Sequence, residues 1–143
     1  MLAAGLLVFL RTRKAGAVLV LAICVDVILT NGILKHVFAR IRPCDIRTEV
    51  QLLVPGPSDY SFPSGHTAVS FAAVTALYLA GEKKLWKPAL VLAVLIAFSR
   101  LYLYVHYPTD ILGGMAAGAV AGYLGAYGIR KVEQWRQKRK EMA

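Results

Sequence analysis

Long apolar segments separated by short polar ones dominate this chain. They cover residues 1–10, 15–38, 66–80, 88–104 and 109–130. A helix needs about 20 mostly apolar residues to cross the hydrocarbon core of a bilayer, and several of these segments approach that length. With 57% hydrophobic residues and a mean hydropathy of +0.55, the chain is too apolar for an ordinary soluble domain of this size. We therefore expect an all-α fold, a polytopic bundle of transmembrane helices that forms one domain over residues 1–130.

The first apolar segment is too short to cross a bilayer by itself. A helix over residues 1–10 spans about 15 Å, roughly half of the hydrocarbon core. Its charged residues follow the apolar part and no small-residue cleavage site is evident, which disfavours a signal peptide. We expect this segment to be the second half of a spanning helix whose beginning lies upstream of Met1.

Basic residues are concentrated in the polar segments and give the chain a net charge of +9. They gather at residues 11–14, at residues 83–87 and in the polar tail, residues 131–143. Short basic loops between apolar spans are typical of the cytoplasmic side of a membrane, so this charge is weak support for a nucleic-acid partner. We expect the tail to be cytoplasmic. The two cysteines, Cys24 and Cys44, predict neither a disulfide framework nor a metal site.

The polar turn at residues 59–67 leads directly into an apolar segment. Pro63 suits the position just before a helix, Ser64 is a good N-cap, and Gly65 lets a ligand approach the backbone. The free N–H groups and the dipole of the following helix would favour a phosphate there. His66, in the first turn, could donate a proton to a leaving group. A capped helix with a surface histidine is the simpler explanation of this turn taken alone.

Two further polar clusters lie at the ends of apolar segments. Lys35 and Arg42 are about two helical turns apart, so they can share one helix face, and Pro43 predicts that the helix ends there. The other cluster consists of Arg100, His106 and Asp110. Asp26 lies inside an apolar segment, where an acid is costly, so it should face the bundle interior or water. For Asp26 we favour a structural hydrogen bond over a catalytic role.

Placing the basic loops in the cytoplasm brings all three clusters to the outer side of the membrane. Segments 15–38 and 88–104 then run outward, and segments 66–80 and 109–130 run inward. One face of the bundle would collect two histidines, an aspartate, three cations and a Ser-Gly turn, namely His66, His106, Asp110, Lys35, Arg42, Arg100, Ser64 and Gly65. An ion pair or an interfacial anchor explains any one of these residues, but it explains their convergence poorly.

This set is suited to phosphoryl transfer. Three cations and a helix N-terminus would bind a doubly or triply charged oxyanion. An aspartate that accepts a hydrogen bond from histidine Nδ1–H leaves Nε2 free to attack, and a second histidine can protonate the leaving oxygen. Because side chains neutralise the charge, we expect no cofactor and no metal.

Three motifs of the chain resemble the signature of the type-2 phosphatidic acid phosphatase superfamily. They are Lys35-x6-Arg42-Pro43, Pro63-Ser64-Gly65-His66 and Ser99-Arg100-x5-His106-x3-Asp110. The resemblance covers residues 35–110. It implies that His106 is a nucleophile forming a phosphohistidine, that Asp110 orients it and that His66 is the general acid. It implies phosphate-binding roles for Lys35, Arg42, Ser64, Gly65 and Arg100. It also implies six spanning helices, in agreement with a segment upstream of Met1.

Within this superfamily, residues 59–67 and the short length are similar to small bacterial enzymes that act on isoprenoid lipid diphosphates. The resemblance implies an integral-membrane phosphatase of the bacterial cell membrane, with its active site outside the cytoplasm, that converts undecaprenyl diphosphate into undecaprenyl phosphate and phosphate. Phosphatidylglycerol phosphate and phosphatidic acid are alternative substrates. The spanning segments disfavour a vanadium haloperoxidase, and the complete residue set disfavours a non-catalytic scaffold. Nothing in the sequence indicates an oligomeric state.

Overall fold

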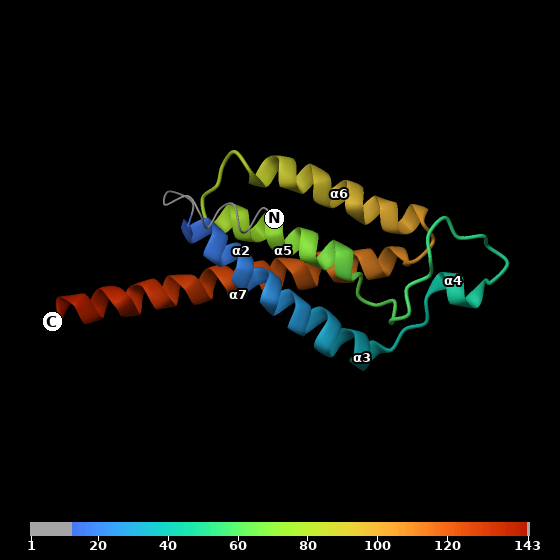
Figure 1. Ribbon diagram of the computed structural model, residues 1–143, viewed down its shortest axis with the longest axis horizontal. Coiled ribbons are helices and arrows are strands. Elements are labelled where there is room, and N and C mark those ends of the chain that lie inside the picture. Colours follow the sequence, from blue (N-terminus) through green and yellow to red (C-terminus); the bar gives the residue numbers. More distant parts are fainter. Residues whose placement is uncertain (1–12, 143) are drawn as a thin grey trace.

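The computed structural model describes residues 13–142, and every regular element in that range is helical (Figure 1). The elements are α2 (Arg13–Asp26), η1 (Val27–Leu34), α3 (Lys35–Phe38), α4 (Pro43–Ile46), α5 (Gly65–Leu79), α6 (Trp86–Tyr102) and α7 (Pro108–Glu141). The predicted all-α architecture is confirmed for this range. The predicted half-span at residues 1–10 lies outside the described residues, and the segment expected upstream of Met1 stays a prediction.

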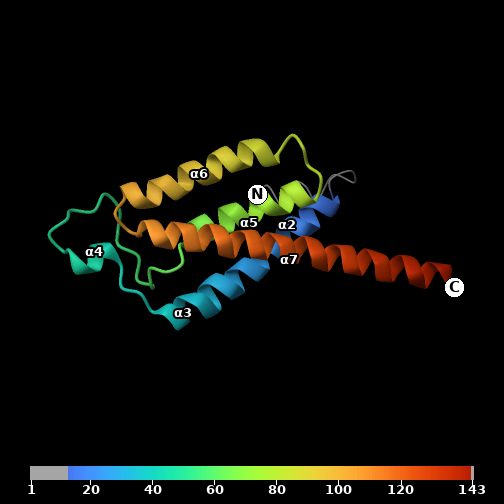
Figure 2. The same ribbon diagram turned by 180° about the vertical axis from the view of Figure 1, so that it is seen from behind.

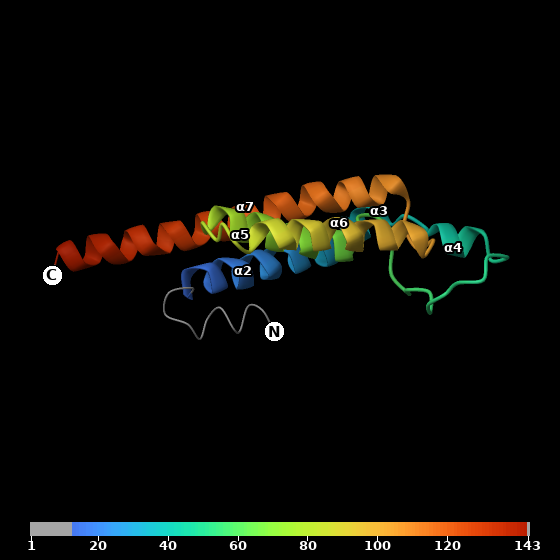
Figure 3. The ribbon, with the colours of Figure 1, turned by 90° about the horizontal axis from the view of Figure 1, so that it is seen from above.

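The long helices form an elongated bundle around α5, which packs against α2, α6 and α7. The view from behind shows α4 and its loop at one end of this bundle, where α3 and α6 end and α7 begins (Figure 2). Seen from above, α7 extends past the other helices at the opposite end (Figure 3). The three polar clusters of the sequence therefore lie at one end, and the chain's C-terminal residues lie at the other.

The helices α2, η1 and α3 follow one another without a break, in agreement with the predicted segment 15–38. The middle part, η1, is a π-helix, a wider turn that is often found at functional sites. Asp26 and Thr30 are both buried, and Thr30 Oγ1 donates a hydrogen bond of 3.0 Å to Asp26 Oδ1. This contact agrees with a structural role for Asp26. The helical run ends at Phe38, where Ala39 adopts a left-handed conformation with a φ of 42°.

Glycines allow α7 to lie directly against α5. A Cβ atom added at Gly118 would lie 2.2 Å from the backbone oxygen of Ala68, and one at Gly114 would lie 2.7 Å from that of Ser64. The spacing of these glycines predicts such close helix contact. As a result, the starts of α5 and α7 are held together, and these two starts carry the second and third motifs.

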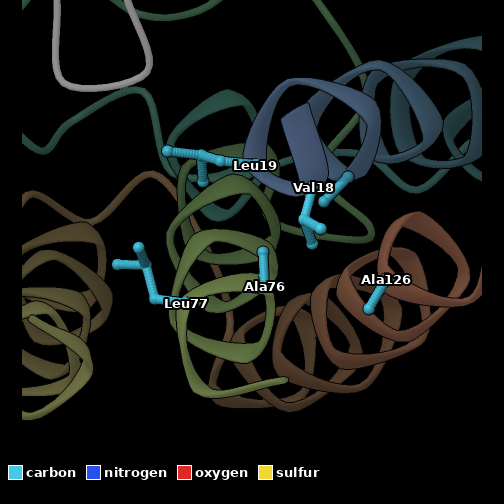
Figure 4. Packing of buried hydrophobic residues seen from close by; sticks show 6 residues of the cluster. Val18, Leu19, Ala76, Leu77 and Ala126 are labelled. Atoms are coloured by element: carbon cyan, nitrogen blue, oxygen red, sulfur yellow. The ribbon is translucent and has the colours of Figure 1, made fainter. Parts of the chain in front are cut away.

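Far from the polar end, small and medium side chains of α2, α5 and α7 form the apolar core (Figure 4). Its buried members are Val18, Leu19, Ala22, Ala76, Leu77 and Ala126. Larger apolar side chains instead point outward: on α6, Leu95 is 60% exposed and Phe98 is 65% exposed. A small-residue core inside an apolar surface is the arrangement expected of helices packed in lipid. By length and composition, two helical stretches can cross a membrane, Arg13–Ile46 and Pro108–Glu141, and Gly65–Leu79 is apolar but shorter.

The bounds of α5 and α6 lie within two residues of the predicted segments 66–80 and 88–104. The last helix begins at Pro108, next to the predicted start, but it continues to Glu141 instead of ending near Arg130. Residues 131–141 are mostly arginine, lysine, glutamate and glutamine, which favour helix, and contain neither glycine nor proline. Which parts of these helices lie in the membrane, and the cytoplasmic position of residues 131–143, stay predictions.

Candidate active site

A cavity of 380 Å³ opens at the polar end of the bundle. Six residues predicted from the motifs line it, namely Lys35, Arg42, Gly65, His66, Arg100 and His106. The other two predicted residues, Ser64 and Asp110, are fully buried. The structure thus brings side chains from all three motifs to one place.

Arg42 reaches this cavity from extended backbone, with φ −73° and ψ 152°. The expectation that Lys35 and Arg42 share a helix face was wrong, because the helix ends at Phe38 and the chain turns at Ala39. Both side chains nevertheless line the same cavity. The Arg42 side chain is 2% exposed, and its Nη1 donates to the backbone oxygen of Val105 at 2.8 Å. The first motif is therefore assembled by the path of the chain after α3.

His106 lies on the turn between α6 and α7, buried against two charged groups. Its Nε2 is 3.2 Å from Arg42 Nη1, and its Nδ1 is 3.5 Å from Asp110 Oδ2. Nδ1 makes no hydrogen bond to any described residue, because its 3.5 Å separation from Asp110 Oδ2 is longer than an ordinary hydrogen bond. Catalytic hydrogen bonds are often this long before substrate binds. The ring is oriented with Nδ1 toward Asp110 and Nε2 toward Arg42.

The pKa of His106 is lowered from its ordinary value. Burial is the largest cause, and the positive charge of Arg42 acts in the same direction, while Asp110 opposes both. A lowered pKa keeps the imidazole neutral at neutral pH. Only the neutral ring has a lone pair on Nε2 with which to attack phosphorus.

Asp110 is held by several donors at the start of α7. Its Oδ2 accepts hydrogen bonds from Ser61 Oγ and from the backbone N–H of Tyr107, the latter at 2.8 Å. Its Oδ1 accepts a hydrogen bond of 2.8 Å from Arg40 Nη1. The Arg40 guanidinium also lies 3.9 Å from the centre of the Tyr107 ring and donates to Thr109 Oγ1 at 2.6 Å. These contacts fix the carboxylate beside His106.

The start of α5 differs in one detail from the prediction. Ser64 occupies the N-cap position, but its side chain caps no backbone N–H and instead accepts a hydrogen bond of 3.0 Å from Thr67 Oγ1. The first N–H groups of the helix are therefore not taken by a capping side chain, and such groups favour an anion. The space beside Gly65 is open only because glycine has no side chain. A Cβ atom added there would lie 3.3 Å from Asn31 Oδ1, a tight contact. His66 is exposed and lines the cavity.

Arg100 completes the cationic lining from the last turn of α6. It is half-buried, and its Nε donates to Ser99 Oγ at 3.2 Å. Three cations, from α3, from the extended backbone before α4 and from α6, thus line one cavity together with His66 and His106. This arrangement is suited to binding a multiply charged oxyanion next to a candidate acid, His66, and a candidate nucleophile, His106.

Three residues that the motifs leave without a role are part of this site: Asp59, Ser61 and Arg40. Asp59 pairs with both cations of the first motif, while Ser61 and Arg40 hold Asp110. Asp59 and Ser61 stand in the same polar turn as His66, and this position is the sequence signal that could have indicated them. Arg40 carries no such signal, since a second arginine beside Arg42 is equally explained as an interfacial anchor.

Comparison with known proteins gives the family. The sequence profile described as the PAP2 superfamily matches residues 15–134. The chain belongs to this superfamily. It is 36% identical over 134 residues to an undecaprenyl-diphosphatase of Sulfolobus acidocaldarius, covering 90% of this chain and 65% of that protein. It is 34% identical over 140 residues to phosphatidylglycerophosphatase B of Bacillus subtilis, covering 91% of this chain and 66% of that protein. The chain thus spans about two thirds of these relatives.

Solved PAP2 structures share the fold. LpxE of Aquifex aeolicus superposes with a TM-score of 0.73 at 32% identity, covering 87% of this chain and 73% of that one. A transmembrane PAP2-type phosphatidylglycerolphosphate phosphatase of Bacillus subtilis superposes with a TM-score of 0.68 at 31% identity, covering 91% of this chain and 66% of that one. The predicted fold class, an all-α bundle of the transmembrane type, and the predicted superfamily are both confirmed.

Proposed function

We propose that this chain is a membrane lipid phosphatase that acts through a phosphohistidine intermediate. The observation that carries the proposal is the buried His106, placed between Asp110 and Arg42 at a cavity that Lys35 and Arg100 also line. The names of two relatives, undecaprenyl-diphosphatase and phosphatidylglycerophosphatase B, describe hydrolysis of lipid phosphates and support the same class of reaction.

In the first step, His106 Nε2 attacks the phosphorus atom of the terminal phosphate. The bond from phosphorus to the leaving oxygen breaks, and His66 supplies the proton that this oxygen takes up. Asp110 accepts the Nδ1–H of His106 and stabilises the positive charge that forms on the ring. The three cations and the N-terminus of α5 stabilise the charge on the phosphoryl oxygens, a task that in other enzymes a metal performs.

In the second step, water attacks the phosphohistidine. His66, now neutral, takes the proton of the water, the N–P bond breaks, and inorganic phosphate leaves. The atoms balance, because one water is consumed for each phosphate released and both histidines return to their starting states.

Undecaprenyl diphosphate is the substrate we propose first. The relative with 36% identity is named for this activity, and residues 59–67 resemble enzymes of that kind. Phosphatidylglycerol phosphate or phosphatidic acid is the second candidate, supported by the relative and the solved structure named for the phosphatidylglycerol phosphate reaction. Side-by-side turnover of the three lipids distinguishes them. A strong preference for a glycerolipid monoester would contradict the first candidate.

We also propose a multi-pass position in a bacterial cell membrane with the cavity on the extracytoplasmic side. The basic C-terminal part of α7 lies at the end of the bundle opposite the cavity (Figure 1). Near that end, Lys14 forms an ion pair with Glu133, so two basic segments lie together. Basic segments favour the cytoplasmic side. In a variant that carries Cys24→Ser and Cys44→Ser, a membrane-impermeant thiol reagent should label Ser58→Cys in intact cells. Labelling only after lysis would contradict this orientation.

Phosphate release from undecaprenyl diphosphate in detergent, with excess chelator, tests the proposed reaction. We expect the full-length protein to remain active in chelator and His106→Ala to be inactive. Loss of activity in chelator would contradict metal-free catalysis. Absence of activity toward all three lipids in a folded protein would contradict the proposed function.

A further inference from the structure

The Asp59 carboxylate lies between the two cations of the first motif. Its Oδ1 accepts a hydrogen bond of 2.5 Å from Arg42 Nη2, and its Oδ2 accepts one from Lys35 Nζ. Its backbone oxygen accepts a further bond of 2.8 Å from Arg42 Nε. The side chains of Lys35 and Arg42 are 7% and 2% exposed, whereas that of Asp59 is 52% exposed. A carboxylate on the loop surface therefore neutralises two cations that are themselves buried.

This ion-pair group lines two cavities. The inner one, of 380 Å³, contains both histidines, and an outer one, of 540 Å³, is lined by loop residues such as Ser58 and Tyr60. Both cavities share Lys35, Arg42 and Asp59 in their linings. Asp59 and its two cations therefore face both the outer cavity and the cavity with His66 and His106.

A carboxylate bound by a lysine and an arginine resembles a bound phosphate group, because two oxygens of either anion can accept from the same donors. The difference is charge. A carboxylate and a phosphodiester each carry one negative charge, whereas a phosphate monoester carries a charge of about −2 at neutral pH. If a phosphodiester displaced Asp59, the negative charge next to Lys35 and Arg42 would stay the same, and Asp59 would lose its partners. A monoester or a terminal diphosphate brings the additional charge that favours exchange.

We propose that Asp59 is a specificity-determining residue: it competes with the substrate for Lys35 and Arg42, and it excludes phosphodiester lipids while terminal phosphates displace it. This inference rests on the proposed phosphatase function and adds to it a means of choosing among lipids. Phosphodiester headgroups surround a membrane enzyme in large excess, so a buried pair of unpaired cations would otherwise bind them. Although partial burial acts to raise the pKa of Asp59, hydrogen bonds from Lys35 and Arg42 hold it below its ordinary value, which keeps this competitor charged at neutral pH.

The test compares the full-length wild type with Asp59→Asn and with a matched control, Asp45→Asn. Asp45 is exposed and lines the same outer cavity, and the structure shows no ion pair from it to Lys35 or Arg42. Both variants remove one negative charge from this cavity. Turnover of the lipid substrate is measured in neutral detergent micelles with a rising mole fraction of phosphatidylglycerol, a phosphodiester, and with inorganic phosphate as a competitive inhibitor.

We expect Asp59→Asn to bind inorganic phosphate about tenfold more tightly than the wild type, the scale of one lost charged hydrogen bond. It should also become sensitive to phosphatidylglycerol, while the wild type and Asp45→Asn stay resistant. Asp59→Glu, which keeps the charge, should stay resistant as well.

Equal inhibition constants for inorganic phosphate in Asp59→Asn and Asp45→Asn would overturn the inference, because the position of the removed charge would then make no difference. Weaker phosphate binding in Asp59→Asn would also overturn it, because Asp59 would then orient the cations rather than compete for them. If the wild type is active, either of these two results contradicts only the proposed role of Asp59 and not the phosphatase function. A wild type that neither hydrolyses lipid phosphates nor binds inorganic phosphate contradicts the proposed function itself.

Discussion

The backbone oxygen of Asp110 accepts a hydrogen bond of 3.0 Å from the N–H of Ser64. This bond ties the start of α7 to the start of α5, next to the close contact of Gly114 with the Ser64 backbone. The carboxylate that faces His106 and the helix N-terminus proposed to hold phosphate are therefore positioned by one junction. A change in the α5–α7 packing should affect the site even when no site residue is altered.

Gly118→Ala should destabilise the protein and reduce activity, because its Cβ atom would lie 2.2 Å from the backbone oxygen of Ala68. Overpacking of this kind costs about 1–3 kcal/mol. Thermal unfolding in detergent measures the effect. Gly32→Ala is the matched control, since a Cβ atom there meets nothing within 4 Å. Equal unfolding temperatures for the two variants would contradict the packing argument.

His66→Ala should reduce kcat/KM by about 10²- to 10⁴-fold on lipid substrates, the usual contribution of a general acid. The constant kcat/KM reports the steps up to phosphorylation of His106, so the later role of His66 as a base toward water does not enter it. The loss of kcat/KM should be much smaller with p-nitrophenyl phosphate, whose leaving oxygen needs no proton. An equal loss of kcat/KM on both substrates would mean that His66 binds phosphate instead of protonating the leaving group.

Arg40→Ala should lower kcat by about tenfold with little change in KM, because it removes a charged donor to Asp110 without touching the cavity cations. Arg40→Lys should recover part of the activity. Arg47→Ala provides the control, since Arg47 is an exposed arginine of the same loop region. A raised KM with unchanged kcat in Arg40→Ala would show that Arg40 acts on substrate binding.

The titration of His106 should have its midpoint below the ordinary histidine value of about 6.5. Burial and Arg42 disfavour the protonated ring, so the neutral, nucleophilic form should persist as the pH falls toward that lowered pKa and should be lost only below it. NMR of labelled histidine follows this directly, with the His106 signal assigned by its absence in His106→Ala.

Arg42→Gln should move the His106 midpoint to higher pH, because it removes a positive charge 3.2 Å from Nε2. Lys14→Gln, far from the cavity at the other end of the bundle, should leave the midpoint unchanged. A wild-type midpoint at or above the ordinary value would contradict the environment described for His106.

The helices were predictable because their causes are local. Apolar length and proline positions placed α5, α6 and the start of α7 within two residues of their observed bounds. Motif spacing was enough to identify the superfamily and to predict eight candidate site residues, six of which line one cavity. The end of α7 was missed because helix-forming polar residues continue a helix beyond its apolar part.

What the sequence by itself determined was the class of fold and the family, and it predicted the candidate site residues, since composition and spacing are read along the chain. Only the tertiary structure decided how these residues meet. Arg42 contacts His106 from extended backbone after α3, Asp59 pairs with both cations of the first motif, and Arg40 and Ser61 donate hydrogen bonds to Asp110. These contacts join residues 17 to 70 positions apart. Such pairs depend on the path of the loop and on the packing of α5 against α7, which no local pattern records.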